Sequence, residues 1–277
     1  MDPSAASRRE LSRLAAREPI DLARAALAIA REEYPELDEA GYLRALDEFA
    51  FRVMRGLPAG ASPERRVGRL NAVLFHELGF AGNGGDYYDP CNSFLNEVID
   101  RRVGIPITLS LLYMEVGRRC GLRVAGVSFP GHFLCKVSLG EGELIVDAFH
   151  RGQLLGLEEL KRRFAAAAGD AARFDARLLR AARPKEILAR MLQNLRSIYL
   201  DRGDLPRALS AVDRQLLLQP DDVRVLRDRA RLCEELGGAE AAAADLEKVL
   251  ALAPASSDAG ALRARVERLR VGGKLMN

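Results

Sequence analysis

The sequence predicts an α+β domain followed by an all-α repeat module, and three observations lead to this prediction. After Gly121, the apolar residues change from the helical spacing of about 3.6 residues to the two-residue spacing of strands. The predicted strands that follow carry a histidine, His132, and an aspartate, Asp147. Further along, Gly203 and Gly237 stand 34 residues apart within matching apolar patterns, which indicates a helical repeat.

The composition is that of a soluble globular protein and argues against several classes of function. The 277 residues suffice for two domains, and 48% of them are hydrophobic and 29% charged. A net charge of +3, from 42 basic and 39 acidic residues, is too balanced to predict binding to nucleic acid or to an anionic membrane. No apolar run approaches the roughly 18 residues of a membrane span, and the charged N-terminus lacks the apolar core of a signal peptide.

Cysteine and histidine usage predicts a reduced protein of the cytoplasm without a metal site. The four cysteines show no C-x-x-C spacing, and the three histidines are scattered at positions 76, 132 and 150. Zinc sites usually draw their ligands from close pairs, so we expect no metal, and nothing in the sequence indicates a cofactor. Thiols of this kind stay reduced in a cytoplasm.

Three amphipathic helices are predicted before the strands. The first runs from Asp21, which can cap it, to about Glu33, and the second from about Asp38 to Arg55. The third begins at Ser62, with proline at the first helical position. The first 19 residues are polar, and we expect them to be frayed at the start. The apolar faces of the three helices need a core to pack on, which we expect in the segment that follows.

That core is predicted between Ser93 and Phe149. Its expected elements, in order, are helices at 93–102 and 106–120 and strands at 124–129, 132–137 and 144–149. A glycine-rich turn at 140–142 joins the last two strands as a hairpin. The hairpin brings His132 and Asp147 within a few residues of each other. Whether they share a face of the sheet stays open, because a slip of one residue in register reverses the faces.

The C-terminal part is predicted to be helical throughout. A helical stretch at 157–164, an alanine-rich segment at 165–176 and another helical stretch up to Ala182 come first. Arg183 and Pro184 then mark the expected boundary between two domains, 1–182 (core about 62–155) and 183–277. Two repeats, 189–222 and 223–256, resemble the tetratricopeptide repeat in period and pattern. Two repeats are too few to stand alone, so we expect a sealing helix before them and another at 261–269, with disorder from Val271 to Asn277.

Four segments carry a resemblance to one family. Listed in order, they are ELGFAGNGGDYYDP (77–90), NSFLNEVIDRRVGIPITLSLLYMEV (92–116), GVSFPGHFL (126–134) and LIVDAF (144–149). Together they resemble bacterial proteins of the SirB-one type, which join a transglutaminase-like, papain-like core to C-terminal tetratricopeptide repeats. The resemblance implies a buried helix packed on an antiparallel sheet. It also implies that His132 and Asp147 match the His and Asp of a Cys-His-Asp site.

The cysteine of such a site is missing from its usual place. In active transglutaminase-like enzymes a cysteine at the start of the central helix attacks the carbonyl, with the histidine as base and the aspartate as orienter. Here the first turn of that helix, Pro106 to Ser110, contains none. Thr108 can serve there as nucleophile with His132 as base, or it can simply bond a free backbone N–H at the helix start. Ser110, deeper in the helix, and Cys91, in the preceding loop, are further alternatives.

The remaining polar residues also have structural alternatives. His132 can be a hairpin-corner histidine, and Asp147 in an apolar strand needs a partner, which an arginine could also supply. We expect Asn92, Asn96 and Glu97 to cap the first core helix and tie it to the preceding loop. The other histidines, at 76 and 150, are interpreted as surface or packing residues.

Two functions follow from this pattern. The first is an interaction and regulatory protein whose papain-like core has lost its nucleophile and whose repeat module holds a peptide or protein partner. The second is an amidohydrolase, protease or acyltransferase that uses Thr108 or a relocated cysteine with His132 and Asp147. The sequence leaves the oligomeric state and the orientation of the repeats open.

Overall fold

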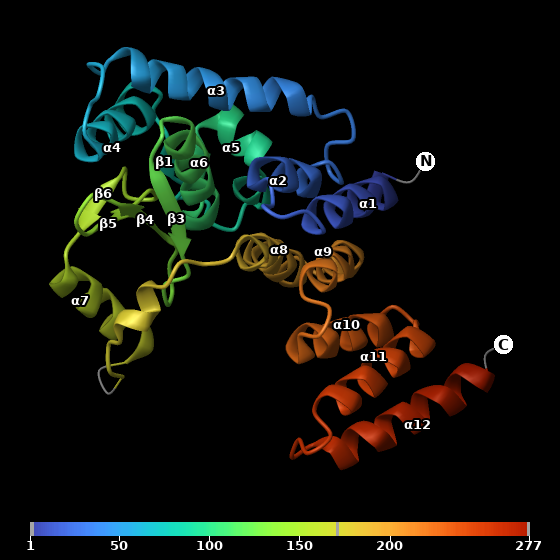
Figure 1. Cartoon of the computed structure of the whole chain (residues 1–277). Coiled ribbons are helices and arrows are strands. Elements are labelled where there is room, and N and C mark those ends of the chain that lie inside the picture. Colours follow the sequence, from blue (N-terminus) through green and yellow to red (C-terminus); the bar gives the residue numbers. More distant parts are fainter. Residues whose placement is uncertain (1–2, 170–171, 276–277) are drawn as a thin grey trace. The chain divides into compact units, whose positions relative to one another are not determined.

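The protein is described here by a computed structural model that covers residues 3–169 and 172–275 (Figure 1). The chain divides into two compact units, Met1–Ile187 and Leu188–Asn277. The first combines helices with a small sheet, and the second contains helices only within its described residues. This mixed architecture, with a helical repeat region after an α+β region, is the predicted fold class.

The N-terminal helices are α1 (Pro3–Ala15), α2 (Leu22–Ala30), α3 (Glu39–Arg55) and α4 (Pro63–Asn71), and a π-helical segment (Ala72–Glu77) continues α4. Two of the predicted starts are confirmed, because the side chains of Asp21 and Ser62 each accept a backbone N–H of the first turn. The expectation that the first 19 residues are frayed at the start was wrong from Pro3 onward, where α1 begins, and residues 1 and 2 lie outside the described residues. In α1, Leu11 and Leu14 are buried, and the Ser7 hydroxyl donates to the carbonyl of Ala28 in α2 (2.7 Å), so packing on α2 holds a helix that its polar composition does not reveal.

The central helix of the first unit is α6 (Pro106–Arg119), and every residue from Pro106 to Gly117 is buried. Before it come a 3₁₀ turn (Pro90–Ser93) and α5 (Leu95–Arg101). Two very short strands, β1 (Ala81–Gly82) and β2 (Val103–Gly104), pair in parallel and fix the glycine-rich loop at 79–90 to the segment just before α6. Strands of two residues are too short for a periodicity signal, which is why the sequence did not predict them.

The sheet is an antiparallel meander of β3 (Arg123–Val127), β4 (Leu134–Ser138), β5 (Glu143–Asp147) and β6 (Gln153–Leu155). Cys135 pairs with Val146, which sets the register of the predicted hairpin. His132 lies in the turn before β4 and not in the strand, where the sequence prediction placed it. The strand β6 was not predicted as such.

The two faces of the sheet pack against different helices. The Cys135 thiol donates to the carbonyl of Ser110 in α6, so this face meets the central helix. The opposite face packs on α7 (Leu157–Ala168), where Leu134 and Ile145 share a hydrophobic cluster with Leu160 and other apolar residues. Because side chains alternate along a strand, Asp147 lies on the same face as Ile145, towards α7.

The prediction of another helical stretch up to Ala182, after the alanine-rich segment at 165–176, was wrong. Gly169 adopts a positive φ of 87° and ends α7, and in the described residues between it and Ala182 only a 3₁₀ turn (Ala176–Leu179) follows. Ala181 then bridges Val127 of β3, and the amide of Ala182 donates to Gly126. Pairing with the sheet edge therefore outweighs the helix propensity of the alanines. Residues 170 and 171, in the alanine-rich segment, lie outside the described residues.

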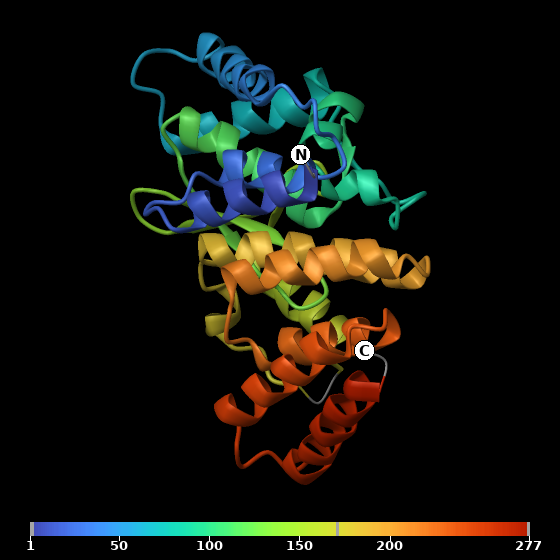
Figure 2. The same ribbon diagram turned by 90° about the vertical axis from the view of Figure 1, so that its right-hand side faces the viewer.

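The second unit is a run of antiparallel helices, drawn in orange and red in Figures 1 and 2. They are α8 (Pro184–Asp201), which begins just before the division, α9 (Leu205–Leu218), α10 (Val223–Glu235), α11 (Ala239–Leu252) and α12 (Ala259–Leu275). Gly203 and Gly237 take the same left-handed conformation, with φ of 71° and 80°, at the same point of the two helix pairs. The expected disorder of Val271–Asn277 was wrong as far as Leu275, because α12 continues to that residue. Residues 276 and 277 lie outside the described residues.

Among the described residues, no helix combines the length and the apolar character needed to cross a bilayer.

Candidate functional site

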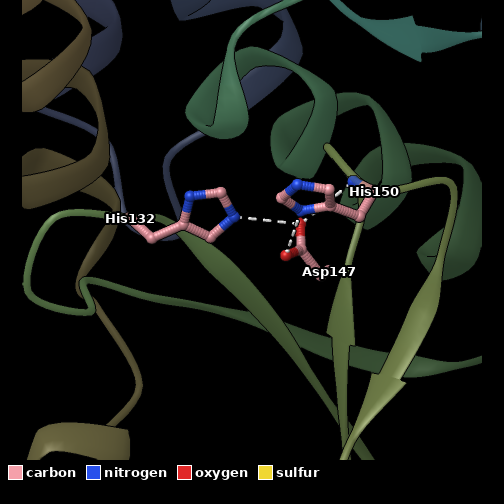
Figure 3. A group of neighbouring side chains, drawn as sticks. All are labelled: His132, Asp147 and His150. Atoms are coloured by element: carbon pink, nitrogen blue, oxygen red, sulfur yellow. Dashed lines mark hydrogen bonds and ion pairs between the residues drawn. The ribbon is translucent and has the colours of Figure 1, made fainter. Parts of the chain in front are cut away.

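His132 and Asp147 meet at the end of the sheet. The ring Nε2 of His132 lies 2.9 Å from Oδ1 of Asp147, and the carboxylate is fully buried. Figure 3 shows both neighbouring imidazole rings turned towards this carboxylate. The register that sequence alone left open therefore brings the two residues together. For Nε2 to donate to the ionised carboxylate, it must carry the ring proton.

Asp147 accepts hydrogen bonds from five donors. Beside His132, its Oδ1 accepts the backbone N–H groups of Phe149 (3.1 Å) and His150 (3.2 Å). Its Oδ2 accepts from Nδ1 of His150 (2.7 Å) and from Nη1 of Arg163 on α7 (2.5 Å). Burial alone would raise the pKa of Asp147, but the bonds from His132, His150 and Arg163 outweigh it and hold the pKa well below its usual range. The carboxylate is thus ionised and saturated with donors.

His150 and Arg163 are members of this cluster that sequence reasoning missed. His150 was interpreted as a surface or packing residue, and its side chain is 51% exposed, but its ring is bound to the carboxylate. The signal was its position three residues after Asp147, where the turn closed by the bond from the Gly152 amide to the Asp147 carbonyl folds it back. For Arg163, the only hint was that a buried carboxylate needs a cation nearby.

An aromatic layer surrounds the cluster. The ring of Phe149 lies 5.9 Å from that of His132 and 5.2 Å from that of His150, measured between centroids. On its other side it approaches Tyr87 at 6.2 Å. A Cβ at Gly82 would lie 2.5 Å from the Phe149 ring, so only glycine allows the loop to approach this closely. The glycine-rich loop is therefore part of the surroundings of the cluster.

Thr108 occupies the first turn of α6, where the sequence analysis expected the nucleophile of a Cys-His-Asp site. Its hydroxyl donates to the carbonyl of Asn92 (2.7 Å), lies 3.2 Å from the carbonyl of Ile105 and accepts the amide N–H of Ile105 (3.1 Å). The side chain is fully buried. These bonds are those of a residue that caps a helix and ties it to the preceding loop. Ser110 lies two residues further along the helix, and its hydroxyl donates to the carbonyl of Phe133 (3.4 Å).

The four cysteines lack the properties of a nucleophilic thiol. Burial raises the pKa of Cys120 to about 11 and that of Cys135 to about 12, and it also raises those of Cys91 and Cys233. Reactive cysteines show the opposite shift, because their thiolates are stabilised by nearby positive charge. Cys91 contacts the hydroxyl of Tyr34 (3.7 Å), and Cys233 belongs to the repeat unit.

The three residues predicted to bind or to tie the loop fall into two groups. Asn92 holds the glycine-rich loop, since its Nδ2 donates to the carbonyl of Asp86 (2.7 Å) and its Oδ1 accepts from Nδ2 of Asn83 (3.1 Å). Asn96 and Glu97 instead line a separate cavity on α5.

The donor atoms of His132, Asp147 and His150 all lie within 4.8 Å of one another, a set that could hold a metal ion. The donor types suit zinc or another transition metal. The surroundings fit an ion poorly, because Arg163 places a positive charge on Oδ2 and both rings already bond the carboxylate. A metal would have to displace the guanidinium and break these bonds. The arrangement is better suited to a hydrogen-bonded cluster.

Two family models match the chain. The model described as transglutaminase-like superfamily matches residues 40–193, and one described as tetratricopeptide repeat matches residues 195–267. No solved structure matches.

Bacterial relatives match over nearly the whole chain. A "UPF0162 protein" of Xylella fastidiosa (strain Temecula1) is 37% identical over 89% of each chain. The corresponding protein of Pseudomonas aeruginosa is 33% identical over 94% of this chain and 92% of its own. The "F-box only protein 21" of Mus musculus is 35% identical over 61% of this chain, which spans 28% of that protein. Since the bacterial relatives carry the name UPF0162, the narrower resemblance to the SirB-one type stays a prediction.

Proposed function

The chain belongs to the transglutaminase-like superfamily, and we propose that it is a member without a nucleophile, a protein-interaction and regulatory protein that binds a peptide or protein partner through its repeat module. In this proposal the His132–Asp147 pair is kept for its structural role. The protein works in the cytoplasm, as its sequence predicts.

One observation carries the proposal. Thr108 stands where a nucleophile would be, and its hydroxyl is buried and bonded to the backbone of Ile105 and Asn92. An attacking hydroxyl has to reach the substrate carbonyl and pass its proton to a base. Here the hydroxyl hydrogen points to a carbonyl oxygen, and leaving that bond would open the start of α6. The raised pKa values of the cysteines support the same conclusion.

The structural role of the pair follows from the geometry of Asp147. It bonds groups from the turn before β4, from the turn after β5 and from α7. A buried carboxylate with all its donors in place stabilises this arrangement, whereas removal of one partner leaves charge without compensation. The cluster therefore fixes two turns and a helix relative to the sheet without any chemical step.

The repeat module supports the binding half of the proposal. Helix pairs of this type stack into extended binding surfaces. An ion pair of Arg196 with Asp228 joins α8 to α10, and one of Arg227 with Asp258 joins α10 to the turn before α12. Leu217 and Leu236 in this unit are more than 40% exposed, and exposed leucines can contact an apolar segment of a partner.

The alternative function is acyl transfer or amide hydrolysis by Thr108 or a relocated cysteine, with His132 as base. The observation in its favour is the 2.9 Å contact of His132 with Asp147, the orientation that a catalytic histidine needs. The two functions make opposite predictions for His132.

The test uses complementation of a deletion strain with folded variants. His132→Gln keeps a hydrogen-bonding side chain but cannot act as base, and Leu217→Glu with Leu236→Glu changes only the repeat surface. We expect the first variant to restore the phenotype and the second to fail, with equal amounts of protein in the cell. If His132→Gln abolishes function while its unfolding temperature is unchanged, the interaction proposal is wrong.

A further inference from the structure

His150 has a second ring nitrogen that the structural role of the cluster leaves unused. Its Nδ1 lies 2.7 Å from Oδ2 of Asp147, and its side chain is 51% exposed. Its Nε2 makes no hydrogen bond among the described residues, and Figure 3 shows this nitrogen turned away from the carboxylate. The ring therefore bonds Asp147 with one nitrogen and leaves the other open to solvent.

The proton of the neutral ring is held at Nδ1. Burial acts to raise the pKa of Asp147, but the bonds from its neighbours hold that pKa well below the usual range, so the carboxylate is ionised. An ionised carboxylate oxygen only accepts hydrogen bonds, so Nδ1 of His150 donates to it. With the proton at Nδ1, Nε2 carries an unshared electron pair that faces solvent. Such a nitrogen can form a covalent bond as a nucleophile.

Asp147 stabilises the ring when Nε2 forms such a bond. The ring then becomes a cation, because the proton stays on Nδ1. The carboxylate has no exposed surface and is also bonded by Arg163 and by backbone N–H groups, so it stays at hydrogen-bond distance from that cation. An opposite charge this close, in a partly buried place, favours the charged form of the ring. His150 is thus a better acceptor than a histidine surrounded by water.

The other two histidines lack this combination. His132 also bonds Asp147, but it does so through Nε2, and its side chain is only 17% exposed. His76, in the π-helical segment, is exposed and makes no bond to a carboxylate among the described residues. Exposure and a fixed carboxylate therefore occur together at His150, and His76 serves as its control.

The charges around His150 suit an anionic group. Arg163 donates to the same oxygen of Asp147 as His150 does, so its guanidinium lies beside the ring. Arg151 follows His150 directly and is exposed. Guanidinium groups bind phosphoryl oxygens through charge-assisted hydrogen bonds. An acyl group on imidazole is soon lost to water, whereas a phosphoryl group persists at neutral pH, so the lasting product is a phosphohistidine.

We propose that Nε2 of His150 is a phosphorylation site that takes a phosphoryl group from a small activated donor of the phosphoramidate or acyl-phosphate class. The electron pair of Nε2 attacks phosphorus, and the bond from phosphorus to the donor's nitrogen or oxygen breaks. Ammonia leaves from phosphoramidate, whose nitrogen is already fully protonated, and a carboxylate leaves from an acyl phosphate. The ring proton stays on Nδ1, so the product is an imidazolium that carries a doubly negative phosphoryl group.

This modification goes beyond the proposed interaction function, and Asp147 acts in it as a positioning residue. It modifies the protein and turns over no substrate, so a core without an acyl-transfer nucleophile can carry it. The bonds to Asp147 stay in place, while the surface at the turn after β5 gains the charge of the phosphoryl group. A charge change of this kind regulates the contacts of a surface with a partner.

The test treats the full chain with potassium phosphoramidate at neutral pH and follows the mass gain of one phosphoryl group. Peptides are prepared without acid, which cleaves phosphorus–nitrogen bonds. We expect modification at His150 to be about tenfold or more faster than at His76 in the same molecules, as for a hydrogen bond to a group that becomes charged. Phosphorus nuclear magnetic resonance should place the group on Nε2. His150→Gln should abolish the fast product, and His76→Gln should leave it unchanged.

Asp147→Asn tests the positioning role at a temperature where this variant is folded. The ratio of the His150 rate to the His76 rate should fall towards one, and both ring nitrogens of His150 should become modified, because the amide no longer fixes the tautomer. An unchanged ratio in the folded variant would overturn the proposal. So would equal rates at the two histidines of the wild type or a wild-type product at Nδ1 of His150, and these two results decide the question even where Asp147→Asn does not fold.

Discussion

Replacing Asp147 with asparagine tests the buried cluster directly. The amide keeps one oxygen but turns the other into an NH₂ group. If the NH₂ group takes the place of Oδ2, it faces the Arg163 and His150 donors; if it takes the place of Oδ1, it faces His132 and two backbone N–H groups. At least two donors then lose their acceptor in a site with no exposed surface on Asp147.

The expected loss of unfolding free energy in Asp147→Asn is large for a change of one atom. Breaking a buried charge pair by removing one partner costs about 3–5 kcal/mol. For a unit of this size, that lowers the unfolding temperature by roughly 10 °C. The matched control is Asp47→Asn, since Asp47 also bonds an arginine, Arg119, but its side chain is 68% exposed. Asp47→Asn should lower the free energy of unfolding by no more than about 1 kcal/mol.

The pH dependence gives the same experiment a second readout. The native pKa of Asp147 is lowered relative to an unfolded chain, so its stabilising contribution is complete above the ordinary aspartate pKa and is lost as the pH falls towards the native value. The stability difference between the wild type and Asp147→Asn should therefore be constant near neutral pH and shrink below about pH 4. Chemical denaturation monitored by circular dichroism measures it. Equal unfolding free energies at pH 7 would refute the account of the cluster.

Three further substitutions test other contacts. Thr108→Val removes the hydroxyl that bonds the backbone of Ile105 and Asn92 at the start of α6, and it should lower the free energy of unfolding in urea by about 1–3 kcal/mol. Thr108→Ser keeps a hydroxyl and should retain most of this free energy. An unchanged free energy of unfolding in Thr108→Val would contradict the capping role. Gly82→Ala should cost about 1–3 kcal/mol because its Cβ meets the Phe149 ring, while Gly84→Ala, with open space around it, should change stability little; similar values for both would contradict the close approach. Gly203→Ala should cost about 1 kcal/mol in the transition of the repeat unit because φ is positive there, and an unchanged transition would contradict that conformation.

Sequence periodicity was sufficient for most of the long elements. The 3.6-residue pattern located α2, α3 and α6 within a few residues, and capping residues such as Asp21 and Ser62 gave their starts. The repeat spacing was readable because Gly203 and Gly237 each need a left-handed backbone. Helix periodicity, capping residues and glycines with a left-handed backbone depend on neighbouring residues only, so they can be predicted from the sequence.

The errors came from contacts between distant segments. Residues 3–15 look polar, yet burial of Leu11 and Leu14 on α2 makes them helical. The alanines before Ala182 favour a helix locally, but Ala181 pairs with β3 instead. Competition of this kind between local propensity and tertiary pairing cannot be judged from one segment alone.

The candidate site was predictable in part for the same reason. The family resemblance singled out His132 and Asp147, but the register that brings them together depends on the whole hairpin. His150 and Arg163 join the carboxylate from a turn and from α7, and neither position follows a periodic pattern. Only the folded chain brings all four side chains together.

The central claim, that the transglutaminase-like core has no working nucleophile, is tested most directly by covalent labelling. The full chain is treated with a hydroxyl-directed fluorophosphonate and, separately, with a thiol-directed chloroacetamide, and the modified residue is identified by mass spectrometry in the wild type and in folded His132→Gln. We expect no labelling that depends on His132. Stoichiometric modification of Thr108 or Cys91 that disappears in His132→Gln would contradict the claim and establish acyl-transfer chemistry instead.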